Sequence, residues 1–182
     1  MNLLIKNVAS DFKDMKILES LNNEAFPKEE RMELHEMIQL ISQNTIEVTA
    51  VYDNDTFIGF YVLSIQRSTA YILFFAIEGS KRRLGYGSKV LALMKKQYVN
   101  CQIVLDMEII DKEAENIEQR KSRKKFYLHN GYYETGFFLN YNNLIMEVLC
   151  TDVKLDINNF QALLNNLKLK KISFVLTKMD LK

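Results

Sequence analysis

Residues 71–90 read YILFFAIEGSKRRLGYGSKV, a seven-residue apolar run that passes directly into a loop with three glycines. An apolar run without polar alternation is typical of a strand buried on both faces, in the middle of a sheet. A helical period follows from Ser88 to Tyr98, where the apolar residues fall on one face. The stretch therefore predicts a central strand, a glycine turn and a helix.

The segments on either side extend this core. Cys101–Ile110 alternates in polarity, which predicts a second strand, joined to the first through a right-handed crossover and parallel to it. Ser10 or Asp11 is expected to cap an early helix that Pro27 ends. The other expected elements are strands at 3–8, 46–52, 57–65, 132–140 and 144–149, turns at 53–55 and 142–143, and helices from about Glu29, at 114–129 and at 158–167. The tail at 172–177 fits either a strand or a helix.

The composition excludes several classes of protein. The 182 residues include 24 basic and 23 acidic ones, so a net charge of +1 favours neither nucleic acid nor an acidic membrane as a partner. No apolar run approaches the ~20 residues needed to span a bilayer. Cys101 and Cys150 fit no disulfide framework or zinc spacing, and His35 and His129 have no partners at ligand spacing. We expect a cytoplasmic monomer or homodimer without a metal.

The glycine loop is the most informative segment for function. At a strand-to-helix turn, backbone N–H groups point outward at the positive end of the helix dipole, which favours an anion. A Walker A loop requires glycine at position 84, which is leucine. The dinucleotide fingerprint also fails, because Val90 stands where its third glycine belongs. The loop is therefore a simple tight turn or an anion site of another kind.

Two motifs resemble those of the GNAT superfamily of N-acetyltransferases. Arg82-Arg83-Leu84-Gly85-Tyr86-Gly87 is similar to the family's pyrophosphate-binding pattern R-x-x-G-x-G. Residues 126–132, FYLHNGY, resemble its second signature, an aromatic pair at a helix end followed by glycine and an aromatic residue. The two motifs occur in the family's order, and the resemblance covers about residues 70–140 well.

The resemblance implies a fold and a domain organisation. The fold class is α/β, with a mixed, mostly antiparallel central sheet of about six to seven strands flanked by helices and a splayed parallel pair of strands. Residues 1–150 are expected to form the acetyltransferase domain, with 151–182 as a helical extension of the same domain.

The resemblance also implies a co-substrate, acetyl-CoA, and the groups that bind it. The pantetheine arm is expected to pair with the backbone of Phe75, Ala76 and Ile77, where an N–H near Ile77 polarises the thioester carbonyl. The amides from Arg83 to Ser88 are expected to hold the pyrophosphate, with Arg82 adding positive charge. The residues of this pyrophosphate segment are Arg83, Leu84, Gly85, Tyr86, Gly87 and Ser88.

The catalytic candidates are one tyrosine and two carboxylates. Tyr127 is the expected general acid for the coenzyme A thiolate, and packing at a helix end is its structural alternative. Glu108 shares a strand face with Asp106 and is the first candidate base, and Glu78 is the second. Neither cysteine lies in the loop or beside Tyr127, which favours direct transfer to a primary amine of a small molecule or peptide. The alternative is a coenzyme A-binding sensor or interaction module without turnover.

Other features of the sequence are left with two interpretations each. Where the family often has asparagine, seven residues before the tyrosine, this chain has Arg120, with Asn116 one turn earlier. The basic run 120–125 is either a solvated helix face or a flank for the adenosine 3′-phosphate. In the segment 26–37, Phe26, Pro27, Met32 and Met37 either border the acceptor site or pack in the core.

Overall fold

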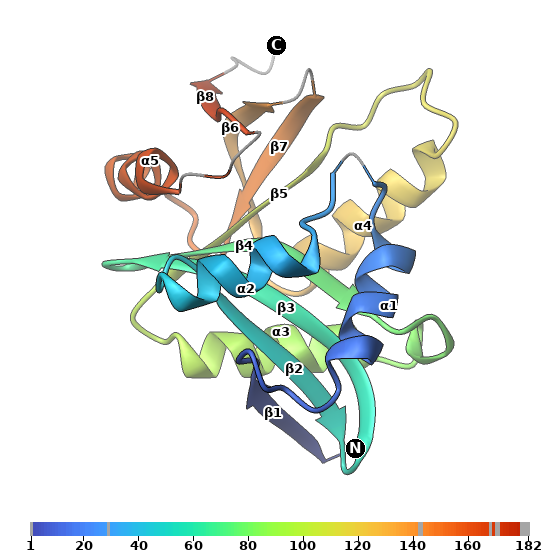
Figure 1. Cartoon of the computed structure of the whole chain (residues 1–182). Helices are drawn as coiled ribbons and strands as arrows, with labels where there is room; N and C mark the ends of the chain where they lie inside the picture. Colours follow the sequence, from blue (N-terminus) through green and yellow to red (C-terminus); the bar gives the residue numbers. More distant parts are fainter. Residues whose placement is uncertain (1, 29, 142–143, 168, 170–171, 179–182) are drawn as a thin grey trace. The chain divides into compact units, whose positions relative to one another are not determined.

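The computed structural model describes residues 2–28, 30–141, 144–167, 169 and 172–178. The chain divides into two compact units, the first made of residues 1–65 and 72–96 and the second of residues 66–71 and 97–182. The described part contains five α-helices and eight strands (Figure 1).

The first unit contains an antiparallel meander. Its strands are β1 (Leu3–Asn7), β2 (Glu47–Asp53), β3 (Thr56–Gln66) and the larger part of β4 (Thr69–Ile77), in the order of the chain. The predicted turn between β2 and β3 is confirmed, and Asn54 adopts the left-handed conformation at φ 54°, which asparagine tolerates better than most residues. Successive residues of β2 and β3 point to opposite faces of the sheet, and nearly all of them are buried, because helices cover both faces.

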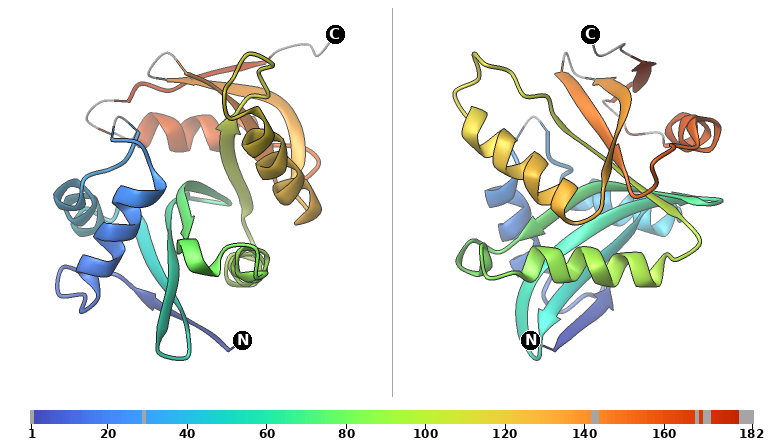
Figure 2. Two further views of the ribbon diagram at one scale, coloured as in Figure 1. Left: turned by 90° about the vertical axis from the view of Figure 1, so that its right-hand side faces the viewer. Right: turned by 180° about the vertical axis from the view of Figure 1, so that it is seen from behind.

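Three helices enclose this meander. Figures 1 and 2 show α1 (Met15–Ala25) and α2 (Leu34–Ser42) on one face and α3 (Tyr86–Gln97) on the other. Each helix buries an apolar stripe, as the helical period predicts. The buried residues are Leu18 and Leu21 of α1, Met37 and Leu40 of α2, and Val90, Leu91 and Met94 of α3.

Two predicted helix starts are wrong. The first helix begins at Met15 rather than after Ser10 or Asp11, with Asp14 at its N-cap. Asp14 does not cap the helix with its side chain; its carboxylate accepts a 2.5 Å hydrogen bond from the Tyr52 hydroxyl, a partner that local sequence cannot reveal. The second helix begins at Leu34. The Glu30 and Arg31 amides donate to the Pro27 carbonyl ahead of that helix, and Glu29, the predicted start, lies outside the described residues.

The second unit contains an antiparallel sheet in the order β5 (Gln102–Glu108), β7 (Leu144–Cys150), β6 (Tyr133–Tyr141) and β8 (Val175–Lys178). Helices α4 (Ile117–His129) and α5 (Ile157–Asn166) lie on opposite faces of it (Figure 2). Gly131 follows α4 in the left-handed conformation at φ 73°, as predicted. The turn predicted at Asn142 and Asn143 lies outside the described residues.

The tail is a strand. Thr177 of β8 lies opposite Phe138 of β6, and the Asn140 side-chain amide donates to the Thr177 hydroxyl at 3.0 Å. Residues 151–182 therefore hold a strand as well as the predicted helix. The expected mixed, mostly antiparallel fold is confirmed, with eight described strands rather than six or seven, because β8 adds to the edge of β6. The boundary predicted at residue 150 stays a prediction.

Gly59 of β3 is required by a close backbone approach. A Cβ atom added to Gly59 would lie 2.1 Å from the Ala76 carbonyl oxygen and 3.1 Å from the Ile77 Cα. Both atoms belong to the end of β4, which cannot retreat as a flexible side chain does. A glycine inside a strand pattern often marks such an approach, so this position was open to prediction from the sequence.

We expect Gly59→Ala to destabilise the protein by about 1–3 kcal/mol, because the methyl group must displace the β4 backbone. Gly79→Ala is the matched control, since its Cβ would meet only the Glu24 carboxylate, at 3.2 Å. Thermal unfolding measures the difference at about 2–4 °C per kcal/mol. Equal melting temperatures for the two variants would contradict the proposed constraint.

Candidate functional site

The predicted site residues divide between the two units. The end of β4, Glu78 and the glycine loop belong to the first unit, and Glu108 and Tyr127 belong to the second.

The glycine loop has the geometry of an anion site. Arg83 and Gly85 both adopt positive φ angles, 64° and 83°, and these turn the chain from the 3-10 helix at Gly79–Lys81 into α3. The Lys89 amide donates to the Gly85 carbonyl, the first bond of the helix. The amides of Tyr86, Gly87 and Ser88 therefore precede the first intrahelical donor and point out of the helix end.

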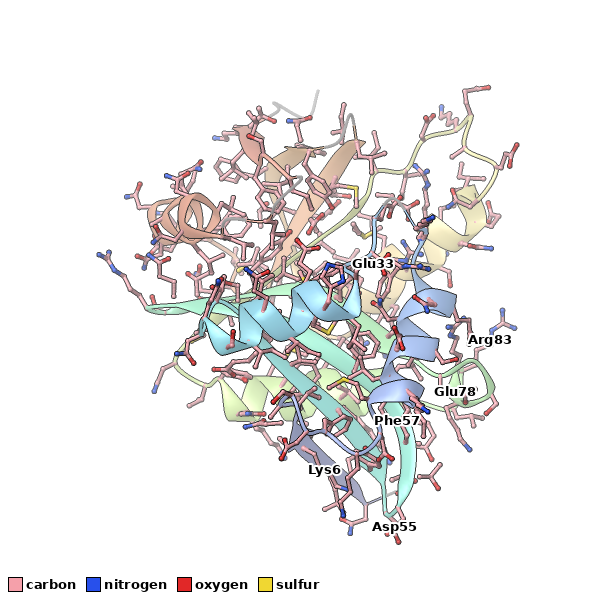
Figure 3. All side chains as sticks on the ribbon, in the orientation of Figure 1. Lys6, Glu33, Asp55, Phe57, Glu78 and Arg83 are labelled. Carbon is pink, nitrogen blue, oxygen red and sulfur yellow. The ribbon has the colours of Figure 1, made fainter. Side chains whose placement is uncertain are left out.

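Arg82 is held by protein groups. Its Nε donates to the Ile77 carbonyl at 2.9 Å, and its Nη2 lies 3.2 Å from the Glu24 carboxylate of α1. The guanidinium thereby ties the loop to the end of β4 and to α1. The neighbouring Arg83 is exposed and lies on the outer side of the loop in Figure 3.

Glu78 caps the 3-10 helix. Its carboxylate accepts hydrogen bonds from the Ser80 amide at 3.1 Å and the Ser80 hydroxyl at 2.5 Å. These bonds stabilise the charged form and lower the pKa of Glu78 below its ordinary value, which makes it a weaker base. A cavity of about 310 Å³ borders it, with Phe57 and Glu78 labelled in Figure 3. Its lining residues are Lys16, Ile17, Ser20, Leu21, Glu24, Phe57 and Glu78.

Glu108 lies in a cluster of α4 side chains. Asn116 Nδ2 donates to its carboxylate at 3.2 Å, Arg120 Nη2 lies 3.4 Å from it, and Arg123 forms a further ion pair with it. Arg120 also bonds Asn116 Oδ1 at 2.7 Å and the Ile109 carbonyl at 3.0 Å. The arginine that replaces the family's asparagine thus helps to fasten α4 to the end of β5.

Tyr127 lies near the C-terminus of α4, half-buried between two aromatic rings. Its ring centroid lies 5.2 Å from that of Phe126 and 5.7 Å from that of Tyr132. Burial raises the pKa of Tyr127 to about 12, while the Arg123 charge opposes the shift and the Asp106 charge adds to it. The phenol is therefore protonated throughout the neutral range.

Most basic side chains in the run 120–125 form ion pairs with carboxylates of the same unit. Lys124 Nζ lies 2.8 Å from the buried Glu147 carboxylate of β7 and also pairs with Glu134 of β6. Lys121 pairs with Glu118 one turn away. The solvated-face interpretation is wrong for Arg120 and Lys124, whose side chains are only 21% and 18% exposed.

The remaining candidates lie in ordinary surroundings. Met32 and Met37 are buried, which confirms the core-packing interpretation for these two residues. The Phe26 ring packs edge-on against Phe60 and Phe74 but is only half-buried, so its place at the acceptor site stays a prediction. Within the described ranges, no three His, Cys, Asp or Glu side chains are grouped as a metal site requires. No helix of the described part is long and apolar enough to cross a membrane.

Comparison with known proteins identifies the family. Residues 15–132 match the acetyltransferase (GNAT) family, a class of acetyl-CoA-dependent N-acetyltransferases. The match covers more than half of the sequence, and the chain belongs to this family. No curated protein matches the sequence.

Solved structures share the fold. A Bacteroides thetaiotaomicron protein assigned to the GNAT family is 24% identical, with a TM-score of 0.71 over 87% of this chain and 92% of that one. An aminoglycoside 6′-N-acetyltransferase complexed with coenzyme A is 16% identical, with a TM-score of 0.65 over 84% and 98%. The PaiA N-acetyltransferase from Thermoplasma acidophilum, in complex with coenzyme A, is 15% identical, with a TM-score of 0.59 over 81% and 98%.

The contacts of Glu108 predict a structural effect. We expect Glu108→Ala to lower the free energy of unfolding by about 2–4 kcal/mol, since it leaves Arg120 and Arg123 without their shared carboxylate. Glu118→Ala, which removes a single exposed ion pair, is expected to cost less than about 0.5 kcal/mol. Urea denaturation measures both variants. A Glu108 variant as stable as the Glu118 variant would show that the cluster does not hold α4.

Proposed function

We propose that the protein transfers the acetyl group of acetyl-CoA directly to a primary amine. The observation that carries this proposal is the glycine loop, whose left-handed Arg83 and Gly85 lead into a helix with outward-pointing first-turn amides. Such a helix end attracts phosphate. Two similar structures are complexes with coenzyme A, which supports the same donor here. An aminoglycoside 6′-N-acetyltransferase and a ribosomal-protein-S18-alanine N-acetyltransferase of the same fold differ in their acceptors, so no acceptor is carried over to this chain.

The backbone from Arg83 to Ser88 would hold the pyrophosphate of the donor. Arg82 would contribute mainly by keeping the loop in place, because its guanidinium already bonds Ile77 and Glu24. The backbone of Phe75, Ala76 and Ile77 would pair with the pantetheine arm. The Ile77 carbonyl already accepts from Arg82, so the Ile77 N–H is the group proposed to polarise the thioester carbonyl.

Tyr127 is proposed to donate a hydrogen bond to the departing thiolate. A phenol with a pKa of about 12 is fully protonated at neutral pH. Full proton transfer to an ordinary thiolate would be uphill by about 5 kcal/mol, at about 1.4 kcal/mol per pKa unit. Tyr127 therefore acts first as a hydrogen-bond donor to the sulfur as the C–S bond breaks, and any proton that it passes to the sulfur must be replaced by the proton that the amine loses.

A carboxylate is proposed to accept the proton that the amine loses. The two carboxylates predicted from the sequence, Glu78 and Glu108, are poor candidates for this base because each is already bound by other protein groups. Glu78 is bound by Ser80, and Glu108 is bound by Asn116 and two arginines. Direct transfer is favoured over an acyl-cysteine, because burial raises the pKa of the Cys150 thiol to about 11 and also raises that of Cys101. A thiol with a raised pKa holds little thiolate at neutral pH.

The loop is tested by placing a negative charge in it. We expect Gly85→Asp to weaken acetyl-CoA binding at least tenfold relative to Gly85→Asn, since the two side chains match in size and both tolerate a positive φ. Only the aspartate repels the pyrophosphate. Thermal shift and calorimetric titration with acetyl-CoA measure the affinity. NAD and ATP are the control ligands.

Four outcomes are informative. Stabilisation of the wild type by acetyl-CoA alone supports the donor assignment. Equal affinity of the two Gly85 variants would contradict pyrophosphate binding by the loop. Absence of stabilisation in well-folded wild-type protein would overturn the proposed function. Binding of acetyl-CoA without transfer of its acetyl group to any amine, and so without release of free coenzyme A, would favour a non-catalytic sensor.

The variant Tyr127→Phe tests whether the Tyr127 hydroxyl assists the departure of the coenzyme A thiolate. We expect kcat to fall by about 10²–10⁴-fold, the typical contribution of general acid catalysis, with the KM for acetyl-CoA little changed. Release of free coenzyme A with an amine library measures both constants. Tyr133→Phe, which alters an exposed tyrosine of β6 in the same unit, is the matched control. A Tyr127 variant with the wild-type kcat would remove this residue from the mechanism.

A further inference from the structure

Asp106 of β5 is a carboxylate that neither motif of the sequence involves. Its Oδ1 accepts a 2.5 Å hydrogen bond from the Tyr71 hydroxyl, and its Oδ2 accepts a 2.7 Å bond from the Tyr141 hydroxyl. Tyr71 belongs to the start of β4 and Tyr141 to the end of β6, and all three residues lie in the second unit. We refer to Asp106, Tyr71 and Tyr141 as the Asp106 cluster.

The cluster is surrounded by aromatic rings. Phe174 packs edge-on against Tyr141 at 5.2 Å between centroids and against Tyr71 at 6.4 Å. Phe160 of α5 packs against Tyr71 at 5.4 Å. Phe160 and Tyr71 are fully buried, whereas Asp106, Tyr141 and Phe174 are half-buried. The cluster is therefore closed on the side of α5, and Asp106 itself is half-buried.

The carboxylate has no cationic partner in the part of the chain that the structure describes. Glu108, Glu134 and Glu147 of this unit pair with arginine or lysine, but Asp106 is not among these ion pairs. Burial raises the pKa of Asp106, and the two tyrosine bonds oppose this shift. A negative charge in this position is stabilised by a cation more than by any neutral ligand.

The remaining hydrogen-bonding capacity of the cluster is also of one kind. A tyrosine hydroxyl has one donor, and Tyr71 and Tyr141 both direct theirs at Asp106. The lone pairs that remain on the Asp106 oxygens and on the Tyr71 oxygen can therefore only accept hydrogen bonds. A primary ammonium has three N–H donors and no acceptor, so it is complementary to this set in both charge and hydrogen bonding.

We infer that the Asp106 cluster binds a primary aliphatic ammonium group of the acceptor. This inference rests on the proposed function and narrows it, since the acceptor class becomes aliphatic amines that are cationic at neutral pH. The competing role is purely structural, in which Asp106 only fastens β4 and β6 to β5. The two roles differ in whether a free ammonium ion binds.

The test is a direct titration of the protein with n-butylammonium chloride at constant ionic strength, in which saturation-transfer NMR detects the binding. n-Butanol is the neutral control of similar size and shape. We expect butylammonium but not butanol to bind the wild type, and Asp106→Asn to weaken the binding at least tenfold, as loss of a charged hydrogen-bond partner does. Glu115→Gln removes an exposed carboxylate from the same unit and is expected to bind as the wild type does.

Tyr71→Phe is a second variant, which keeps the ring and removes one acceptor; we expect it to weaken binding about three- to tenfold. It serves where Asp106→Asn does not fold. Equal binding by the wild type and the folded variants overturns the inference, and so does absence of binding by the wild type. If acetyl-CoA stabilises the protein and butylammonium does not bind, only this inference fails. If butylammonium binds and acetyl-CoA does not, the proposed function fails instead.

Discussion

The conformation of the glycine loop depends on the hydrogen bond from the Arg82 guanidinium to the Ile77 carbonyl. This bond fixes the end of β4 at the residue where the chain must leave the sheet. One residue further, the Glu78 amide bonds the Ile58 carbonyl of β3. Gly59 then allows the β4 backbone to lie closer than any side chain permits. These contacts hold the strand end rigidly, so that the left-handed turns at Arg83 and Gly85 direct the α3 amides outward.

The acidic residues near the predicted site differ in function because they differ in partners. Glu78 is bound by a serine, Glu108 by two arginines and an amide, and Asp106 by two tyrosines. An arginine neutralises a carboxylate, whereas a tyrosine hydroxyl solvates it and leaves its charge in place. Glu108 is thereby neutralised by its arginines, whereas Asp106 has no cationic partner in the described part of the chain and keeps an attraction for an external cation.

Helix α4 shows how ion pairs replace an apolar face. None of its described residues is fully buried, and its weak amphipathicity gives it no continuous apolar face to pack on the sheet. Its attachment comes from Arg120 and Arg123 on Glu108 and from Lys124 on Glu134 and Glu147. Half-buried pairs that share carboxylates are costly to break singly, so the helix that carries Tyr127 is held in place by charge.

The sequence by itself determined the order of the elements, the glycine loop and the family. Apolar runs, a proline and positive-φ residues act over a few positions, and their consequences are local. Only the tertiary structure decided the roles of the charged residues and the start of α1, because Asp14 meets Tyr52 across 38 positions and Asp106 meets both of its tyrosines across 35. The strand β8 was likewise ambiguous until its partner β6 was known, since a four-residue segment of mixed polarity takes its conformation from the edge it joins.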